Sequence, residues 1–251
     1  MRPEPVTDFA PRTVRPTLLS QNWRDVLFLH WPVHPAAVAP LLPPGVFPDV
    51  RNGTTWVGLV AFSMEGLGPG RTSLPYVGTF PEVNVRLYSV DGHGRRGVVF
   101  RSLDCPRLSA VLVARAALGL PYRWSRTRWT ADGDVLHLAT RVRGAGGGGA
   151  RCVLRARVGP RLERPGPLAD FLTARWGLHT RTAGRTVHLP VEHPPWPLHQ
   201  AEVEHLDETL LRAAGIEVLG PPASVLFSPG VPVRFGPGGD AAPRRAEVSS
   251  W

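Results

Sequence analysis

The sequence has 251 residues, of which 43% are hydrophobic and 20% are charged, and this composition excludes a wholly disordered or fibrous chain. A single domain of this length can bury roughly 70–75% of the surface that its unfolded chain exposes, so it needs no disulfide or metal to fold. The formal net charge is +9, all 29 basic residues are arginine, and the sequence contains no lysine.

The strongly basic charge raises the question of nucleic-acid binding. However, the arginines are scattered along the sequence rather than grouped in runs. Complete replacement of lysine by arginine, together with many alanine, glycine and proline residues, is typical of a GC-rich coding bias. We therefore expect solvated arginines whose stems cover apolar surface, and no nucleic-acid partner.

Other features of the sequence indicate the cellular compartment of the protein. Cys105 and Cys152 are too few for a disulfide scaffold. The first residues carry charges and prolines where a signal peptide would need an apolar run. The most apolar later stretch, residues 26–42, is interrupted by histidines and prolines, so it cannot span a bilayer. We expect a cytoplasmic protein with no membrane partner, and a homo-oligomer is left open.

The first half of the chain combines an arm, a short helix and several strands. Residues 1–17 contain prolines and no apolar periodicity, which predicts an N-terminal arm. Residues 34–45 predict a short helix with proline in its first turn and a Pro-Pro-Gly end. The apolar run at 54–64 predicts a strand, and residues 82–90 and 98–104 predict a hairpin. Trp31, Trp56 and Phe62 lie in segments that are apolar on both sides, so we expect them in the core.

The second half predicts a helix at residues 107–118 and short helices at 167–174 and near 208–214. Alternating apolar residues predict further strands, at 122–130, 135–143, 151–158, 176–181, 186–191, 199–205 and 224–235. The Gly/Pro/Ala-rich segment 236–251 predicts a disordered tail, which leaves 18–235 as a single domain. The expected fold class is α+β: a mainly antiparallel, closed or nearly closed barrel with a few short helices.

The predicted hairpin contains the closest grouping of polar residues that could form a site. Strand side chains alternate between faces, which predicts one polar face on the first strand, made of Glu82, Asn84, Arg86 and Tyr88. On the second strand the same rule predicts a shared face for Phe100, Ser102 and Asp104. This polar face either meets water or lines an enclosed cavity. In a cavity, Arg86 would need a charged partner, which Asp104 or Glu82 could supply.

A second candidate segment runs from Phe171 to His199. In one interpretation, Arg175, Trp176 and Trp196 wall a pocket and Arg175 holds a carboxylate. In the other, the aromatic side chains pack the end of the barrel and Arg175 is a structural bridge. Neither interpretation is favoured by the sequence.

Several common sites are not indicated. The nine histidines form no HExxH pattern and the cysteines form no CxxC pattern, so we expect no metal. The glycine run at 146–149 is not followed by Gly-Lys-Ser/Thr, and no GxSxG motif is present. We expect no cofactor.

Several motifs, in order, resemble the YqjF-like family of uncharacterised bacterial proteins, which belongs to the acetoacetate decarboxylase-like superfamily. The matching stretches are FLHWPV (28–33), LLPPGV (41–46), PEVNVRLY (81–88), GVVFRSLDC (97–105), FLTARWGL (171–178), HPPWPLH (193–199) and SPGVPV (228–233). The resemblance implies a β-rich, cone-like barrel around an internal cavity, with flanking helices. It therefore favours the cavity interpretation of the polar face that contains Glu82.

The founding activity of this superfamily uses a lysine that forms a Schiff base with a keto acid. A chain without lysine cannot use that chemistry, because an arginine stays protonated and is not a nucleophile. The leading hypothesis is a protein that binds a small acidic or carbonyl-bearing molecule inside the barrel.

If there is chemistry, Glu82 or Asp104 would act as acid or base in a cofactor-independent lyase, cyclase or isomerase. The ligand would contact Asn84, Arg86, Tyr88, Ser102, Arg175, Trp176 and Trp196. The alternative is a non-catalytic ligand-binding or sensing protein, and a third hypothesis is an arginine-rich nucleic-acid-binding protein.

Overall fold

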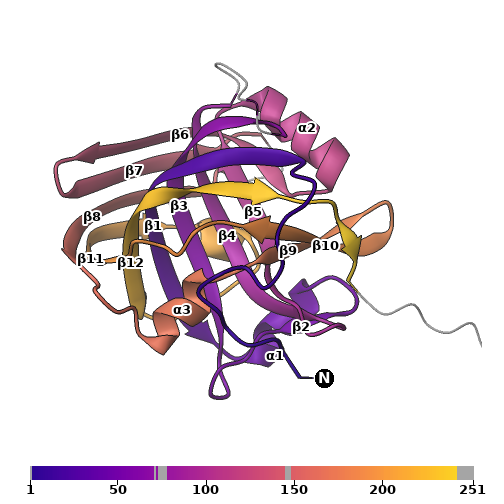
Figure 1. Cartoon of the computed structure of the whole chain (residues 1–251). Helices are drawn as coiled ribbons and strands as arrows, with labels where there is room; N and C mark the ends of the chain where they lie inside the picture. Colours follow the sequence, from indigo (N-terminus) through magenta and orange to yellow (C-terminus); the bar gives the residue numbers. More distant parts are fainter. Residues whose placement is uncertain (1, 71, 73–77, 145–147, 242–251) are drawn as a thin grey trace, which may run out of the picture.

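The computed structural model describes residues 2–70, 72, 78–144 and 148–241, and strands dominate it (Figure 1). The helices are α1 (Pro35–Val38), the 3-10 helix η1 (Ala39–Leu41), α2 (Leu108–Leu118), α3 (Pro167–Thr173) and α4 (Leu210–Ala213). The strands are β1 (Leu19–Val33), β2 (Val46–Pro48), β3 (Thr55–Pro69), β4 (Phe80–Asp91), β5 (Arg96–Cys105), β6 (Tyr122–Asp132), β7 (Val135–Val142), β8 (Arg151–Arg161), β9 (Gly177–Thr182), β10 (Arg185–Glu192), β11 (His199–Glu208), β12 (Ser224–Phe235) and β13 (Gly239–Asp240).

The strands form one mixed sheet that closes on itself in two places. Strand pairing follows the order β13-β10-β9-β5-β6-β7-β8-β11-β12-β1-β3-β4-β2, with further pairings of β10 to β12 and of β5 to β4. These pairings define a nine-strand ring, β1-β3-β4-β5-β6-β7-β8-β11-β12, and a seven-strand ring, β1-β3-β4-β5-β9-β10-β12. The α+β barrel predicted from the sequence is therefore confirmed.

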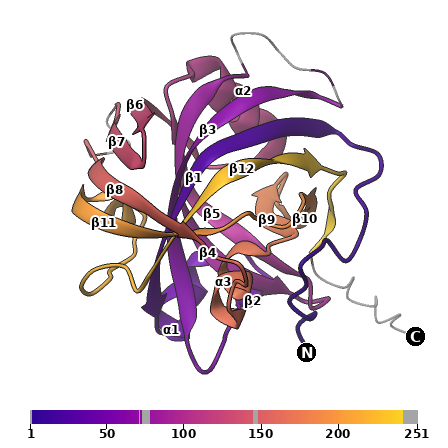
Figure 2. The same cartoon turned by 60° about the vertical axis from the view of Figure 1, so that its left-hand side comes forward.

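Five strands, β12, β1, β3, β4 and β5, belong to both rings and form a shared wall between them (Figure 2). Alternate residues of this wall point into opposite cores. Leu27 and Leu29 of β1 pack into the core of the nine-strand ring, with Trp129 and Leu154 from its far side. Phe28, the residue between them, packs into the core of the seven-strand ring.

The double burial of the wall explains why its sequence is apolar on both faces. Trp31, Trp56 and Phe62 are only 2%, 9% and 2% exposed, so their expected place in the core is confirmed. Most of β4 is buried as well, including its polar residues. The polar residues of the wall are therefore held inside a packed structure rather than at its surface.

The N-terminal arm and the segment directly after β12 both contact the seven-strand ring. In the N-terminal arm, the backbone N–H of Glu4 donates to the carbonyl of Gly94 (2.8 Å), and Val14 is buried. Residues 236–241 continue the fold, although the sequence predicted a disordered tail from Gly236. There, β13 pairs with β10 and Ala241 is completely buried. The rest of that segment, 242–251, lies outside the described residues.

In the described ranges, each helix is too short or too polar to cross a membrane.

Candidate functional site

The polar face of β4 lies inside the seven-strand ring. Glu82, Asn84 and Arg86 are 2%, 4% and 6% exposed, and Tyr88 is completely buried. They share their side of β4 with the aromatic core of that ring, to which Tyr88 belongs. This burial excludes a solvent face, the first of the two alternatives that the sequence left open.

A glycine makes room for two polar side chains on the wall. His30 of β1, Gly58 of β3 and Arg86 of β4 lie directly opposite one another across the three strands. A Cβ atom at Gly58 would be 3.3 Å from Cγ and Nε of Arg86 and 3.3 Å from Cδ2 of His30. Both side chains therefore extend over this glycine and meet above it.

Arg86 is a buried cation without a carboxylate partner. Its Nη2 donates to the hydroxyl of Tyr88 (3.2 Å) and to the carbonyl of Leu172 in α3 (3.3 Å). Its guanidinium carbon lies 5.4 Å from the centre of the Phe28 ring. None of the ion pairs found in the described residues includes Arg86, so the charged partner expected from the hairpin is not there.

Several buried polar atoms around Arg86 have no hydrogen-bond partner in the described part of the chain. They are Nδ1 and Nε2 of His30, Oδ1 of Asn84 and Nε of Arg86. Burial, followed by the charges of Arg86 and Arg175, holds the pKa of His30 well below its usual range, so its imidazole is neutral. An unsatisfied buried polar group costs roughly 1–3 kcal/mol, so these atoms call for a partner, which a ligand or an ordered water can supply.

Glu82 has the properties of a proton carrier. The hydroxyl of Tyr122 donates to its Oε2 (2.7 Å), and Nδ2 of Asn84 donates to its Oε1 (3.4 Å). Burial raises the pKa of Glu82 to about 7 despite these two hydrogen bonds. The carboxyl group can therefore accept or release a proton near neutral pH, as a general acid or base requires.

Ser102 and Asp104 lie on the other face of the wall, which corrects the face assigned to them from the sequence. The β4–β5 register shifts after Val85, and this irregularity reverses the alternation on β5. Asp104 and Ser102 therefore pair with Val83 and Val85, which point into the core of the nine-strand ring. Asp104 accepts two hydrogen bonds from Arg123 (2.6 and 2.8 Å), and burial raises its pKa.

Arg175 matches the structural-bridge interpretation. Its guanidinium forms an ion pair with Asp49, which also binds Arg96. Its Nε donates to the carbonyl of Phe171 (2.8 Å), and its guanidinium carbon lies 4.3 Å from the Phe171 ring centre. With these contacts Arg175 links α3 to the segment before β3, and it is not free to hold a carboxylate.

The two tryptophans of the second candidate segment anchor neighbouring segments. The indole N–H of Trp176 donates to the carbonyl of Thr7 in the N-terminal arm (3.1 Å). The indole N–H of Trp196 donates to the carbonyl of Thr173 at the end of α3 (3.0 Å). Both indole side chains are largely buried, so they pack one end of the seven-strand ring.

Trp196 separates the core of the seven-strand ring from a surface pocket. Its ring packs edge-on against Phe28 (5.2 Å between ring centres) and stacks on Trp23 (5.8 Å). It also lines a surface pocket of about 380 Å³, whose other members come from the N-terminal arm, the segment after β8, α3 and the segment before β11. Trp196 therefore lies between this pocket and the aromatic core that includes Phe28.

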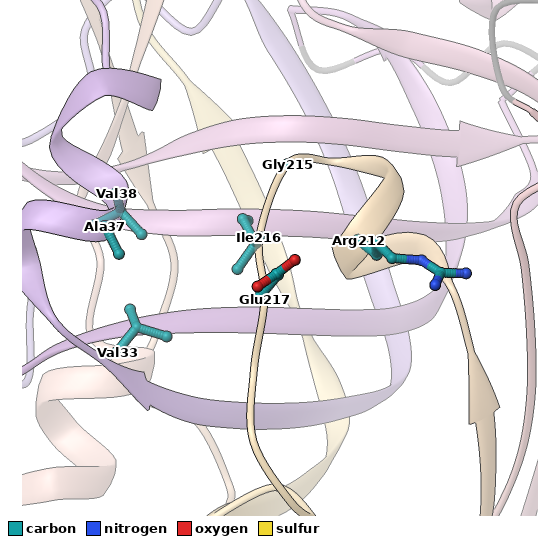
Figure 3. A pocket seen from close by; sticks show the side chains of 7 residues that line it. All are labelled: Val33, Ala37, Val38, Arg212, Gly215, Ile216 and Glu217. Atoms are coloured by element: carbon teal, nitrogen blue, oxygen red, sulfur yellow. The ribbon is translucent and has the colours of Figure 1, made fainter.

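A second pocket lies elsewhere, between α1 and the segment after α4 (Figure 3). Val33, Ala37 and Val38 face Ile216 there, and the side chain of Arg212 extends away from them. None of the residues singled out from the sequence lines this pocket. In the described ranges, no three His, Cys, Asp or Glu side chains gather in a way that could hold a metal ion.

Sequence reasoning missed three residues of the site: His30, Gly58 and Tyr122. Each lies on a different strand, and the pairing of these strands in the sheet brings them to the face of Glu82 and Arg86. A histidine in an apolar strand and a glycine in another were the available signals, but neither indicates its partner.

Comparison with known proteins finds relatives in sequence. A family model, DUF2071, described as an uncharacterized conserved protein, matches residues 20–232. The uncharacterized protein YqjF of Bacillus subtilis (strain 168) is 30% identical over 200 residues, which cover 79% of this chain and 82% of YqjF.

Solved structures show the same architecture at low sequence identity. The enduracididine biosynthesis enzyme MppR complexed with pyruvate has a TM-score of 0.61 at 14% identity and covers 92% of this chain and 93% of its own. Acetoacetate decarboxylase from Legionella pneumophila has a TM-score of 0.61 at 13% identity, covering 93% and 92%. An acetoacetate decarboxylase-like enzyme from Sphingomonas wittichii RW1 has a TM-score of 0.56 at 18% identity, covering 89% and 92%.

Proposed function

Since this chain belongs to the DUF2071 family of uncharacterized conserved proteins and has an acetoacetate decarboxylase-like fold, we propose that it binds a small carboxylate inside the seven-strand ring. In this proposal the carboxylate lies against the guanidinium of Arg86. The neutral ring of His30 would donate its N–H to a neighbouring carbonyl oxygen of the ligand, and Asn84 would donate the N–H of Nδ2 that is not bonded to Glu82. The ligand is therefore a small acid that also carries a carbonyl group.

One observation carries the proposal. The guanidinium of Arg86 is buried without a carboxylate among the described residues, and its Nε has no partner. Burying an isolated charge is costly unless a partner compensates it. An anionic ligand would supply that partner, and its oxygens would accept from Nε of Arg86 and from the ring N–H of His30.

Glu82 adds a chemical step to the proposal. In its ionised form, Glu82 would take a proton from the carbon next to the ligand carbonyl, and in its protonated form it would return that proton. Arg86 and the hydrogen-bonding groups would hold the enolate oxygen and the carboxylate meanwhile. This proton transfer is a keto–enol tautomerisation, the step of a cofactor-independent isomerase, and Tyr122 keeps Glu82 oriented for it.

The lysine-based chemistry of the superfamily does not apply to this chain. No lysine is present to form a Schiff base, and a guanidinium cannot replace the amine. A general-base step needs only a carboxylate with a pKa near the working pH, which Glu82 has.

Binding is tested first with pyruvate, the small keto acid with which the MppR enzyme is complexed in its solved structure. Isothermal titration compares the wild type with Arg86→Met and with the control Arg101→Met. Arg101 is a half-buried arginine of β5 that donates to backbone carbonyls of Leu41 and Ala214.

We expect Arg86→Met to lower the affinity for pyruvate at least about thirtyfold, as loss of a buried charge pair does, and Arg101→Met to leave it unchanged. Equal affinities in all three proteins would overturn the assignment of Arg86.

Catalysis is tested by deuterium exchange. In D₂O, a general base acting on bound pyruvate exchanges the methyl protons, and proton NMR follows the loss of that signal. Glu82→Gln should abolish this exchange while pyruvate still binds. If the wild type binds pyruvate without accelerating exchange, the alternative of a non-catalytic binding or sensing protein is correct.

A further inference from the structure

The outer face of the nine-strand ring gathers arginines on three neighbouring strands. The exposed arginines of β6, of β7 with the residue that follows it, and of the part of β8 that pairs with β7 (151–157) are Arg126, Arg128, Arg141, Arg143, Arg151, Arg155 and Arg157. Their side chains alternate with buried residues such as Trp129, Leu138 and Leu154, which point into the ring. The three strands lie side by side at the left of Figure 1.

Acidic residues neutralise only the part of this face that belongs to β8. Arg151 pairs with Asp207 (3.1 Å), Arg155 pairs with Glu204 (2.7 Å), and Arg157 pairs with Asp134 and Glu204 (2.8 Å each). The remaining four, which we call the arginine cluster, have no acidic partner in the described part of the chain: Arg126, Arg128, Arg141 and Arg143.

Strand register places these like charges opposite one another. Arg126 of β6 lies directly across from Arg141 of β7, and Arg141 lies directly across from Arg151 of β8. Like charges directly opposite each other in a sheet are destabilising. The free protein therefore carries a repulsion at this face that an anionic partner would relieve.

An exposed aromatic side chain borders the arginine cluster. Trp124 is 38% exposed, and the guanidinium carbon of Arg143 lies 4.5 Å from its ring centre. The backbone N–H of Arg143 donates to the carbonyl of Trp124 (2.8 Å), which fixes the two residues side by side. Arginines that hold phosphates beside an aromatic ring that stacks a base are the elements of single-strand recognition.

We propose that this face binds single-stranded nucleic acid, with the arginine cluster on the phosphates and Trp124 against a base. The proposal reverses the expectation from the sequence. There the arginines are separated by other residues, and only the pairing of β6 with β7 brings them together. The site is independent of the ligand site in the seven-strand ring, because it lies on the outer face of the other ring.

The test measures fluorescence anisotropy of a labelled single-stranded oligonucleotide across a series of salt concentrations. If the cluster contacts three or four phosphates, the logarithm of the affinity should fall against the logarithm of salt with a slope of about −2 to −3.

A matched pair of variants separates the cluster from general charge effects. Arg126→Gln with Arg141→Gln removes two charges from the cluster, and Arg155→Gln with Arg157→Gln removes two neutralised charges from the same face. We expect the first pair to reduce affinity at low salt at least tenfold and to flatten the slope by about 1.4, and the second to change both little. Equal losses would show an effect of net charge alone and would overturn the proposal.

Trp124→Leu distinguishes nucleic acid from another polyanion. Loss of a stacked base should reduce affinity about tenfold while the salt slope stays the same. An acidic peptide such as poly-glutamate should compete weakly. If poly-glutamate binds as tightly as the oligonucleotide and Trp124→Leu has no effect, the face recognises acidic protein segments and the proposal is wrong.

Discussion

Arg86 and Arg175 are both buried arginines in the seven-strand ring, but their surroundings give them different roles. Arg175 has an ion-pair partner in Asp49 and donates to a backbone carbonyl, so its charge is compensated within the protein. Arg86 has a hydroxyl and a backbone carbonyl as partners, and its Nε remains unpartnered. The first contributes to stability, whereas the second is suited to binding an anion.

Methionine substitutions should separate these roles. Arg175→Met should lower the free energy of unfolding by about 3 kcal/mol, because it breaks a buried pair. Arg86→Met should change it by less than about 1 kcal/mol or raise it, because an uncompensated buried charge is removed. Urea denaturation of both variants measures the difference, and an equal large loss in the two would show that Arg86 also has a structural partner.

Glu82 should make stability depend on pH. Its pKa rises from 4.5 to about 7 on folding, so the native state binds the proton more tightly than the unfolded state. The resulting stabilisation is complete below pH 4.5 and is lost as pH rises through about 7.

Glu82→Gln lacks this titration. The free energy of unfolding of the variant, relative to that of the wild type, should therefore rise by about 2–3 kcal/mol from pH 5 to pH 8. Urea midpoints at the two pH values measure it. The hydrogen bond from Tyr122 lowers the pKa of Glu82, so this pKa should be higher in Tyr122→Phe. The pH-dependent fall in the stability of that variant should therefore continue to a higher pH than in the wild type. A constant difference between Glu82→Gln and wild type across this range would place the pKa of Glu82 near its ordinary value.

Closure of the seven-strand ring depends on a close approach between β5 and β9. Val98 pairs with Leu178 there, and a Cβ atom at Gly97 would lie 2.7 Å from the carbonyl oxygen of Gly177. Backbone atoms cannot yield as a flexible side chain can, so the two strands must move apart if Gly97 is replaced.

Gly97→Ala should therefore destabilise the protein by about 3 kcal/mol, near the upper end for overpacking. Gly159→Ala is the control, since its Cβ would meet Gln200 at an ordinary 3.4 Å, and it should change stability by less than about 0.5 kcal/mol. Thermal unfolding of both variants tests the prediction. Equal stability of the two alanine variants would mean that β5 and β9 can separate without cost.

The sequence predicted most elements because alternation is visible locally, and β12 was predicted with the bounds that it has. The single strand β1 is less evident from the sequence, because His30 and Pro32 interrupt its apolar run. The reversal of faces on β5 arises from its pairing with β4, so nothing in the β5 sequence indicates it. For that reason the shared face of Glu82, Asn84 and Arg86 was predicted correctly, whereas the face of Asp104 was not.

At the scale of the whole molecule, the segment after β12 connects two parts of the seven-strand ring, namely β10 and the turn between β4 and β5. Asp240 of β13 accepts hydrogen bonds from Arg185 (2.6 and 2.7 Å), and its backbone carbonyl accepts one from Arg95. The backbone N–H of Ala241 donates to the carbonyl of Thr186 (3.1 Å). These contacts join the segment to β10 and to the turn after β4.

Deleting residues 236–251 should therefore lower the melting temperature by about 4–8 °C, which corresponds to a loss of about 2 kcal/mol for a domain of this size. Deleting 242–251 leaves all of the contacts just described and is the matched control. Differential scanning calorimetry of the two truncated proteins measures the shift. An unchanged melting temperature in the longer deletion would show that the contacts of residues 236–241 add no stability.

The shared wall also determines when the protein can fold during its synthesis. Leu19 of β1 pairs with Phe235 of β12, and both rings contain these two strands. A ribosome that adds roughly 5–20 residues per second therefore makes β1, β3 and β4 well before the strand that completes either ring. Until then, strands that are apolar on both faces have no second layer to cover them. The risk of aggregation is consequently highest during synthesis on the ribosome. A chaperone that binds the nascent chain until β12 emerges would therefore protect this protein better than one that acts after its release.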